Sequence, residues 1–408
     1  MKYVFFILIS IVTVFLVWLN YPLVYRSVDP YDKITDAVMH LNFIGKELKQ
    51  NKLGERMQNT YPEGYVFINA LYGLSWCELA LSDPGRGAAL KNKALNEALF
   101  AYREVNSERA KLPFDKTLYP ECGIYYFGWK NYLLSKILML DTNFAGHEFL
   151  INDYNFGCSA LKQIINGKEN PYMQTYQGST WPSDMFVAVA SLKNYGRIFG
   201  GMYDSDVITW VNKVKARLDP ATGMVPHKVN PGTGMTTQGP RGSSMSLTLR
   251  MLTEIDTVFA WEQYRLLEKN FASSFLGLPY LREYPKGIDG KGDIDSGPVI
   301  FGIGFSGTVV MISTYASLGL AGLCENQFRT IDRFGFSTGS DNGRMYLLGK
   351  YPMADAFVAW GITSDLKNLS AGSKLSPFRF NWFSGLSFLL VLLLWLLFFR
   401  KKIFGRSS

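Results

Sequence analysis

The stretch FLLVLLLWLLFF, residues 388–399, decides the architecture of this chain. It carries no charge, and the uncharged run to which it belongs begins at Phe380. A helix needs about 20 mainly apolar residues to cross a hydrocarbon layer about 30 Å thick. A buried core helix normally keeps a polar face, but the polar residues here, Asn381, Ser384 and Ser387, all lie near the start. The sequence therefore predicts a transmembrane helix over residues 379–399.

A second uncharged run, residues 3–25, lies at the other end of the chain and is rich in Phe, Ile, Leu and Val. A secretory signal peptide is the alternative interpretation, but its small-residue cleavage site of the A-x-A type does not follow the run. We therefore predict a retained transmembrane anchor over residues 1–27.

Basic residues predict the orientation of both helices. Arg400, Lys401, Lys402 and Arg406 lie in the short tail 400–408, and short basic segments stay in the cytoplasm. Two spans return Lys2 to the same side. We therefore expect both termini to be cytoplasmic and residues 28–378 to form an extracytoplasmic domain, periplasmic or at the cell surface.

The net charge of +8 comes mainly from basic residues beside the two predicted spans. Without Lys2 and the four basic residues of the tail, 37 of the 42 basic residues remain against 34 acidic ones, a net charge of about +3. The basic excess is thus mainly a topology signal, and we expect the membrane as a partner and no nucleic acid.

Helical periodicity dominates the residues between the two spans. No linker rich in Pro, Ser and Gly divides them, so we predict one large domain. The predicted helices are 34–48, 65–81, 88–105, 124–140, 148–165, 186–199, 206–218, 243–267 (one helix or two), 300–324 and 353–362. The best strand signal is 224–228, in a hairpin between the turns DPATG (219–223) and NPGTG (230–234). At about 30 residues per helix and loop, this pattern fits an all-α (α/α)6 toroid of helical hairpins with a short β-hairpin, and an irregular α-solenoid is the alternative.

Cysteine and histidine usage limits the chemistry. The four cysteines form no C-x-x-C pair, so they are disulfide candidates with three possible pairings, or small buried side chains. Only three histidines are present, and nucleotide-binding and zinc-protease motifs are absent, so we expect no cofactor and no metal site.

Two segments combine an acid with aromatic residues just before a predicted helix. In YPEGY (61–65), Glu63 lies between Tyr61 and Tyr65; in WPSD (181–184), Trp181 precedes Asp184. Proline and an acid in a first helical turn also simply stabilise a helix start. The functional interpretation is a carboxylate beside aromatic surfaces that bind a flat or apolar ligand.

Two further segments carry polar residues among glycines. His227 lies in the predicted hairpin, and Arg241 has Gly239 and Gly242 close to it, which frees its guanidinium to bind an anion unless the segment is a surface loop. Asp293 and Asp295 follow Gly292 and share one side of an extended segment. They are candidate acid–base groups, ion ligands or helix caps, but the segment lacks the later positions of a calcium-binding EF-hand loop.

The acid-bearing helix starts at 61–65 and 181–184, alternating with outer helices, resemble those of (α/α)6-toroid proteins, namely six-hairpin glycosidases and the linalool dehydratase-isomerase type. The stretch from Trp181 through DPATG (219–223) and His227 to the helix at 243 looks most like the latter. That type has cysteines near the helix corresponding to 186–192, where this chain has Trp181 and Asp184, so terpene-alcohol chemistry is not implied.

The sequence thus predicts acid–base chemistry on a saccharide or cell-envelope glycan. The predicted catalytic residues are Glu63, Asp184 and Asp295. The predicted substrate-binding residues are Tyr61, Tyr65, Trp181, His227, Arg241 and Asp293. A dehydratase- or isomerase-like lyase on a small alcohol, and a non-catalytic domain that binds a glycan, lipid or protein, are the alternatives.

Overall fold

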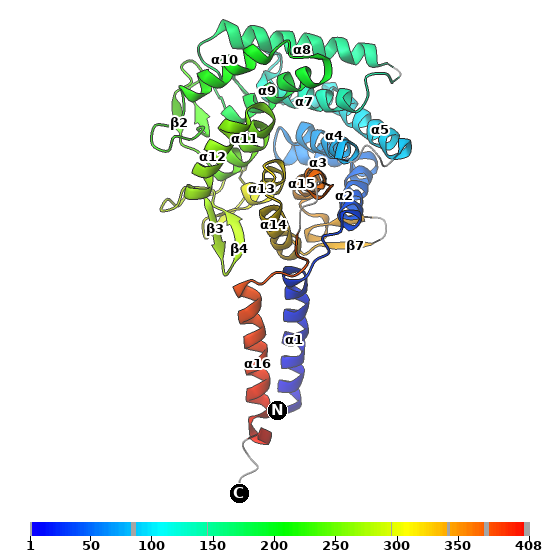
Figure 1. Ribbon diagram of the computed structural model, residues 1–408, viewed down its shortest axis with the longest axis vertical. Coiled ribbons are helices and arrows are strands. Elements are labelled where there is room, and N and C mark those ends of the chain that lie inside the picture. The colour runs from blue at the N-terminus through cyan, green and yellow to red at the C-terminus, as the bar shows by residue number, and fades with distance from the viewer. Residues whose placement is uncertain are drawn as a thin grey trace.

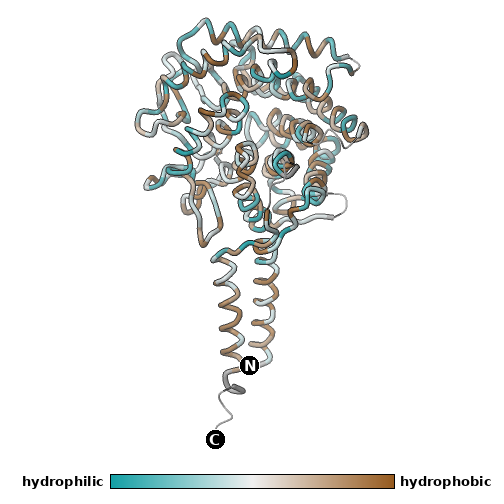
Figure 2. Tube along the Cα trace, viewed as in Figure 1, coloured by the Kyte–Doolittle hydropathy of each residue, from teal (hydrophilic) through white to brown (hydrophobic). Residues whose placement is uncertain are grey.

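The computed structural model describes residues 2–82, 87–144, 146–294, 296–340, 343–370 and 375–403. The chain is mostly helical, and two long helices project side by side from one end of a larger domain (Figure 1). These are α1 (Lys2–Val24) and α16 (Trp382–Ile403). Both are long and apolar enough to cross a membrane, on length and composition alone, and both are hydrophobic along most of their length (Figure 2). Trp395 Nε1 on α16 donates a hydrogen bond of 3.0 Å to Thr13 Oγ1 on α1.

Six helices of the domain contact one another in succession. They are α4 (Gly64–Ser82), α7 (Gly123–Leu140), α9 (Pro182–Phe199), α11 (Gly242–Ile255), α13 (Phe305–Ser317) and α15 (Pro352–Ser370). Each packs against the next, and α15 packs against α4, so the series of contacts closes on itself. Nearly every residue of α4 and α7 is buried. A helix enclosed by neighbours carries apolar side chains on every face for this reason.

Six further helices pack against the first six. They are α2 (Pro30–Gln50), α5 (Ala88–Val105), α8 (His147–Gly167), α10 (Asp204–Lys215), α12 (Thr257–Asn270) and α14 (Ala321–Phe334). Each contacts at least one of the first six, for example α2 with α15 and α5 with α4. They are amphipathic, with one buried and one solvated face. Shorter helices are α3 (Leu53–Thr60), α6 (Glu108–Lys111) and η2 (Leu347–Gly349).

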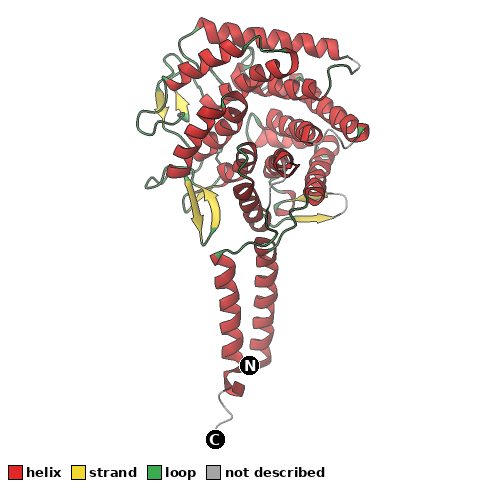
Figure 3. Cartoon of the chain, viewed as in Figure 1, coloured by secondary structure: helices red, strands yellow, loops and turns green. Residues whose placement is uncertain are grey.

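Four two-stranded antiparallel sheets occur in the described part of the chain, where the sequence predicted one hairpin (Figure 3). They pair β1 (Lys228–Val229) with β2 (Thr236–Gln238), β3 (Ala272–Phe275) with β4 (Leu278–Leu281), β5 (Val299–Ile300) with β6 (Ile303–Gly304), and β7 (Thr338–Ser340) with β8 (Gly343–Met345). The turns Leu276–Gly277 and Phe301–Gly302 both have positive φ at their two residues, from 49° to 84°. Such turns join the strands of tight hairpins.

Three predicted helices have different bounds. The helix predicted over 353–362 extends to Ser370 as α15. The predicted helix 243–267 is two helices, because Asp256 caps α12 by accepting a hydrogen bond of 3.0 Å from Phe259 N. The prediction of one helix over 300–324 was wrong, since Ile300 belongs to β5 and α13 ends before Gly319, which has a φ of +73°. All four cysteines are buried and free, so none forms a disulfide.

A buried charge cluster joins α4, α7, α11 and α15. Glu78 lies within 3.1 Å of Lys136 Nζ, 3.2 Å of Arg250 Nη2 and 2.9 Å of Lys367 Nζ. Glu254 accepts from Lys136 and Arg250 at 2.9 and 2.8 Å. The cations hold the pKa of both glutamates below the usual value although burial alone would raise it. The cluster is satisfied internally and connects the helices.

Candidate functional site

Glu63 lies at the start of α4, where the chain approaches α3 closely. A Cβ added to Gly64 would lie 2.2 Å from Met57 O, so only glycine fits there. Gly64 N donates to Tyr61 O at 3.0 Å, and Phe67 N donates to Glu63 O at 2.9 Å. The half-buried Glu63 carboxylate accepts a hydrogen bond from the hydroxyl of Tyr176, which belongs to the loop before α9. The starts of α4 and α9 therefore meet at Glu63.

The loop before α9 is also joined to the start of α7. Ile124 N donates to Gln174 O at 3.0 Å. Gly123 has a φ of +77°, and a Cβ there would lie 2.3 Å from Thr175 O. Thr175 Oγ1 in turn donates to Asp184, in the first turn of α9. Backbone contacts that admit no side chain thus hold Asp184 next to α7.

Tyr125, in the first turn of α7, lies close to both carboxylates. Its side chain is buried and its hydroxyl has no hydrogen-bond partner among the described residues. Burial raises the pKa of Tyr125 well above its usual value, and the negative charges of Glu63 and Asp184 raise it further, followed by Tyr61 and Tyr176. Two carboxylates from different helix starts therefore act electrostatically on one buried hydroxyl that has no hydrogen-bond partner in the described part of the chain. We call these three residues, with Tyr61 and Tyr176, the carboxylate–tyrosine cluster.

Aromatic rings border this cluster. The ring of Phe114 stacks on Tyr176 with centroids 5.8 Å apart and on Tyr125 at 6.0 Å. Trp181 meets Tyr176 edge to face at 6.2 Å, and Lys228 Nζ lies 4.6 Å from the centroid of Trp181. Rings in such arrangements provide flat apolar surfaces for a ligand.

Tyr65 belongs to a different part of the structure. Its hydroxyl donates to Glu104 Oε2 on α5 at 2.5 Å, and its ring packs against Gly54 of α3. It therefore shares the sequence motif of Glu63 but contacts α3 and α5, away from the carboxylates of Glu63 and Asp184.

Arg241, just before α11, is the centre of a second group. Its Nε lies 2.7 Å from Glu283 Oε1, and its Nη1 forms an ion pair with Asp293. Burial would raise the pKa of Asp293, but the hydrogen bond from Arg241 lowers it to about 2. Ser243 Oγ also donates to Glu283 at 2.7 Å, and burial of that fully enclosed glutamate raises its pKa. We call these residues the Arg241 cluster.

His227, the residue before β1, lies beside the Arg241 cluster. Its Nδ1 is 3.1 Å from Ser244 Oγ in the first turn of α11. Burial, and then the positive charge of Arg241, lower the pKa of His227 to about 4. The imidazole is therefore neutral at neutral pH.

Strand β1 links the two groups, because Val229 N donates to Thr180 O at 3.2 Å beside Trp181. The structure thus brings Glu63, Asp184, Tyr61 and Trp181 together, and His227 with Arg241 and Asp293. Asp295 lies outside the described residues. In the described part of the chain, no group of three or more His, Cys, Asp and Glu side chains is arranged to hold a metal ion.

Sequence reasoning missed Tyr125, Tyr176 and Phe114. One signal points to the first of them: an aromatic residue followed by proline stands at Tyr61-Pro62, Tyr119-Pro120 and Trp181-Pro182, shortly before α4, α7 and α9. The three helix starts that form the carboxylate–tyrosine cluster therefore share one sequence pattern.

The chain matches no protein-family model and no curated protein.

Proposed function

We propose that the domain is an (α/α)6 toroid tethered to a membrane by α1 and α16. The inner ring would be the six helices whose contacts close on themselves, and the outer ring the six helices packed against them. The basic tail favours cytoplasmic termini and an extracytoplasmic domain. Such an architecture would be the one that the sequence resemblance to six-hairpin glycosidases and to the linalool dehydratase-isomerase type implies.

The proposed activity is acid–base chemistry on a saccharide, most directly a cell-envelope glycan. The adjacent residues Thr175 and Tyr176 donate hydrogen bonds to Asp184 and Glu63, and this link between the two carboxylates carries the proposal. One carboxylic acid protonates the leaving oxygen while the second carboxylate activates water or stabilises the oxocarbenium-like state. Asp184 is buried and Glu63 is only half-buried, so we assign the water-facing role to Glu63 and proton donation to Asp184. Tyr61, Tyr176 and Trp181 provide stacking surfaces.

A glycan-binding domain without catalysis is the second candidate. Both carboxylates already accept a hydrogen bond within the protein, Glu63 from Tyr176 and Asp184 from Thr175. A carboxylate held in this way also suits recognition of sugar hydroxyls. The two candidates share the site and differ in whether a glycosidic bond breaks.

The test uses the full chain in detergent and a panel of labelled cell-envelope oligosaccharides and chromogenic aryl glycosides. For an enzyme, we expect hydrolysis by the wild type and a loss in kcat of about 100-fold or more in Glu63→Gln and in Asp184→Asn. Glu108→Gln is the matched control, because Glu108 is an exposed glutamate on α6.

Calorimetric titration of the same oligosaccharides separates the candidates. Binding without turnover, weakened by Glu63→Gln and Asp184→Asn, supports the binding domain. If both variants turn over substrate at the wild-type rate, the catalytic proposal is overturned. If the wild type neither hydrolyses nor binds any member of the panel, saccharides are overturned as the ligand class.

A further inference from the structure

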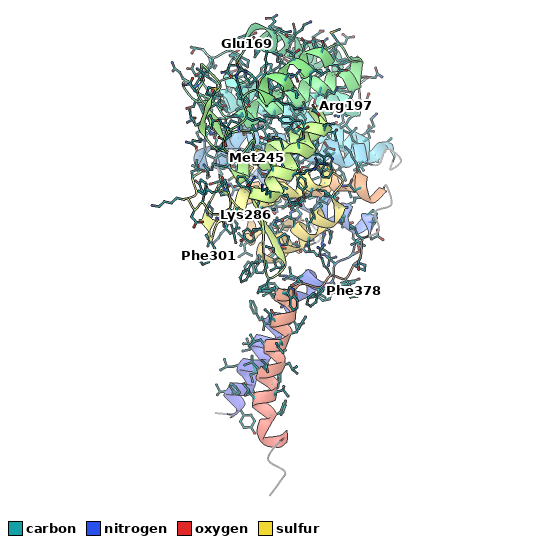
Figure 4. All side chains as sticks on the ribbon, turned by 60° about the vertical axis from the view of Figure 1, so that its left-hand side comes forward. Glu169, Arg197, Met245, Lys286, Phe301 and Phe378 are labelled. Carbon is teal, nitrogen blue, oxygen red and sulfur yellow. The ribbon has the colours of Figure 1, made fainter. Side chains whose placement is uncertain are left out.

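Exposed apolar side chains gather at the end of the domain from which α1 and α16 leave. They come from five separate segments, and we name them the apolar collar: Phe275, Phe301, Phe336, Leu348, Phe378 and Phe380. Figure 4 shows Phe301 and Phe378 at this end and Glu169 at the opposite one. Phe301 is 92% exposed and Leu348 is 72% exposed. Exposed apolar side chains that gather in this way on the surface of a domain mark an interaction site.

The collar is continuous with α16. Phe383 N, in the first turn of α16, donates to Leu276 O at 3.0 Å. This bond places the β3–β4 turn, and with it Phe275, at the start of α16. An isolated bridge between Ile303 and Arg282, the residue after β4, joins the β5–β6 hairpin to that strand, and Figure 4 shows Phe301 toward the same end of the domain as Phe378.

The collar is also continuous with α1. The ring of Phe336 stacks on Trp18 of α1 with centroids 6.2 Å apart, and the guanidinium of Arg333 lies 4.1 Å from the same indole. Leu347 N donates to Gly335 O at 2.9 Å, which holds η2 next to Phe336. Trp at the end of a membrane helix, with Arg above it, is the arrangement found at the interface between hydrocarbon and headgroups.

The backbone gives a second, independent observation. Leu276, Phe301, Leu347 and Leu348 all have positive φ, between 47° and 56°. The left-handed region is sterically unfavourable for an L-residue, and such turns normally carry Gly, Asn or Asp. Here each strained turn position presents a large apolar side chain on the face from which the two helices emerge.

We propose that the apolar collar lies in the interfacial layer of a phospholipid bilayer, with the turns at Phe275, Phe301 and Leu348 inserted around α1 and α16. The inference rests on the membrane tether proposed above. It adds that the domain sits on the bilayer in a fixed orientation and does not hang from a flexible stalk. The occupant is lipid because the collar is joined to both apolar helices, to α16 by the bond from Phe383 N to Leu276 O and to α1 by the stacking of Phe336 on Trp18.

The test is depth-dependent quenching of a fluorescent probe on the full chain, reconstituted in phosphatidylcholine vesicles. The four native cysteines are buried, so a thiol-reactive bimane reports on an introduced cysteine. Phe301→Cys and Leu348→Cys probe the collar. Phe156→Cys is the matched control, because Phe156 is 74% exposed and lies on α8, at the far end of the domain. Leu390→Cys reports on α16 itself.

We expect probes at residues 301 and 348 to shift to the blue and to be quenched by lipids that carry a nitroxide near the headgroup, while the probe at residue 156 is quenched only by aqueous iodide. Quenching at residue 390 without quenching at residues 301 and 348 overturns the collar and leaves the tether intact. If the lipid nitroxides do not quench the probe at residue 390, the tether itself is overturned. Shielding of residues 301 and 348 from both quenchers shows that protein covers the collar, for example a second copy, and overturns the assignment to lipid.

Discussion

Replacing Glu78 with glutamine tests whether the buried charge cluster stabilises the domain. Glu78 is 1% exposed and contacts Lys136, Arg250 and Lys367 at 2.9–3.2 Å. The substitution removes one of the two carboxylates that neutralise the buried Lys136 and Arg250. Removing one partner of a buried ion pair costs about 3–5 kcal/mol, because a buried charge remains uncompensated.

The expected fall in melting temperature follows from the size of the domain. The entropy of unfolding is about 2 cal/mol/K per residue, or roughly 0.7 kcal/mol/K for about 350 residues. A loss of 3–5 kcal/mol in stability therefore lowers the melting temperature by about 4–7 °C. Far-UV circular dichroism of the full chain in detergent, at one scan rate for all variants, measures the shift.

Glu108→Gln is the control for this prediction. Glu108 also contacts two lysines, Lys111 at 2.8 Å and Lys116 at 2.9 Å, but it is 72% exposed. Exposed ion pairs contribute little because solvent screens them, so we expect no change in melting temperature. Equal shifts in the two variants would refute the argument that burial makes the charge cluster indispensable.

The effect also has a pH signature. The pKa of Glu78 is lowered in the folded state, so its stabilisation is present above the unfolded pKa, about 4.3, and is lost as the pH falls toward the folded value. The difference between wild type and Glu78→Gln should therefore shrink below about pH 4. A difference that stays constant down to pH 3 would contradict the assignment.

Two further predictions concern the Arg241 cluster. Gly242→Ala should lower the free energy of unfolding by about 1–3 kcal/mol, because the new methyl group would lie 2.0 Å from Arg282 O, whereas Gly239→Ala should be neutral in urea unfolding, since nothing lies within 4 Å of its added Cβ. His227→Gln should flatten the pH dependence of stability between about pH 6.5 and 4. In the wild type the folded pKa of about 4 makes stability fall by up to about 3 kcal/mol as the unfolded state takes up a proton in this window; an unchanged slope in the variant would show that His227 is not the titrating group.

The sequence predicted the two terminal helices to within a few residues, because a run without charge has a visible end at the first charged or polar residue. It predicted most helices of the domain for a similar reason, since their apolar periodicity stops at Gly, Pro or Asp. It failed at α14 and at the hairpins β3–β4 and β5–β6. Their turns, Leu276–Gly277 and Phe301–Gly302, place a large apolar residue where the usual turn signal is Asn or Asp.

The sequence singled out Glu63 and Asp184 individually, but neither the missed Tyr125 and Tyr176 nor the group as a whole. Glu63 and Asp184 stand 121 positions apart in the chain, and no local pattern states that both lie near Tyr125. The same reasoning placed Tyr65 beside Glu63, yet successive positions at a helix start point in different directions. Tyr65 contacts Glu104 on α5 instead.

Helix starts also explain why acids at these positions are ambiguous in a sequence. An aromatic–proline pair precedes α4, α7, α9 and α15, and an acidic residue lies within three positions of each proline. Proline fixes the first helical turn, and the helix dipole stabilises a carboxylate there whether or not it has a function. Asp355 of α15 shows the structural case, because its buried carboxylate accepts from Tyr346 N at 2.9 Å and lies 3.1 Å from His40 Nδ1.

Glu63 and Asp184 differ from Asp355 in what surrounds them. Asp355 is completely buried and has a backbone donor and an imidazole as partners. Glu63 and Asp184 instead accept from hydroxyl groups, of Tyr176 and Thr175. Both charges raise the pKa of Tyr125, whose hydroxyl has no hydrogen-bond partner among the residues that the structure describes. A helix cap needs only one backbone amide, so a role in capping explains neither the shared tyrosine nor the stacked rings around it. That difference is the physical reason to test these two carboxylates before any other acid in the chain.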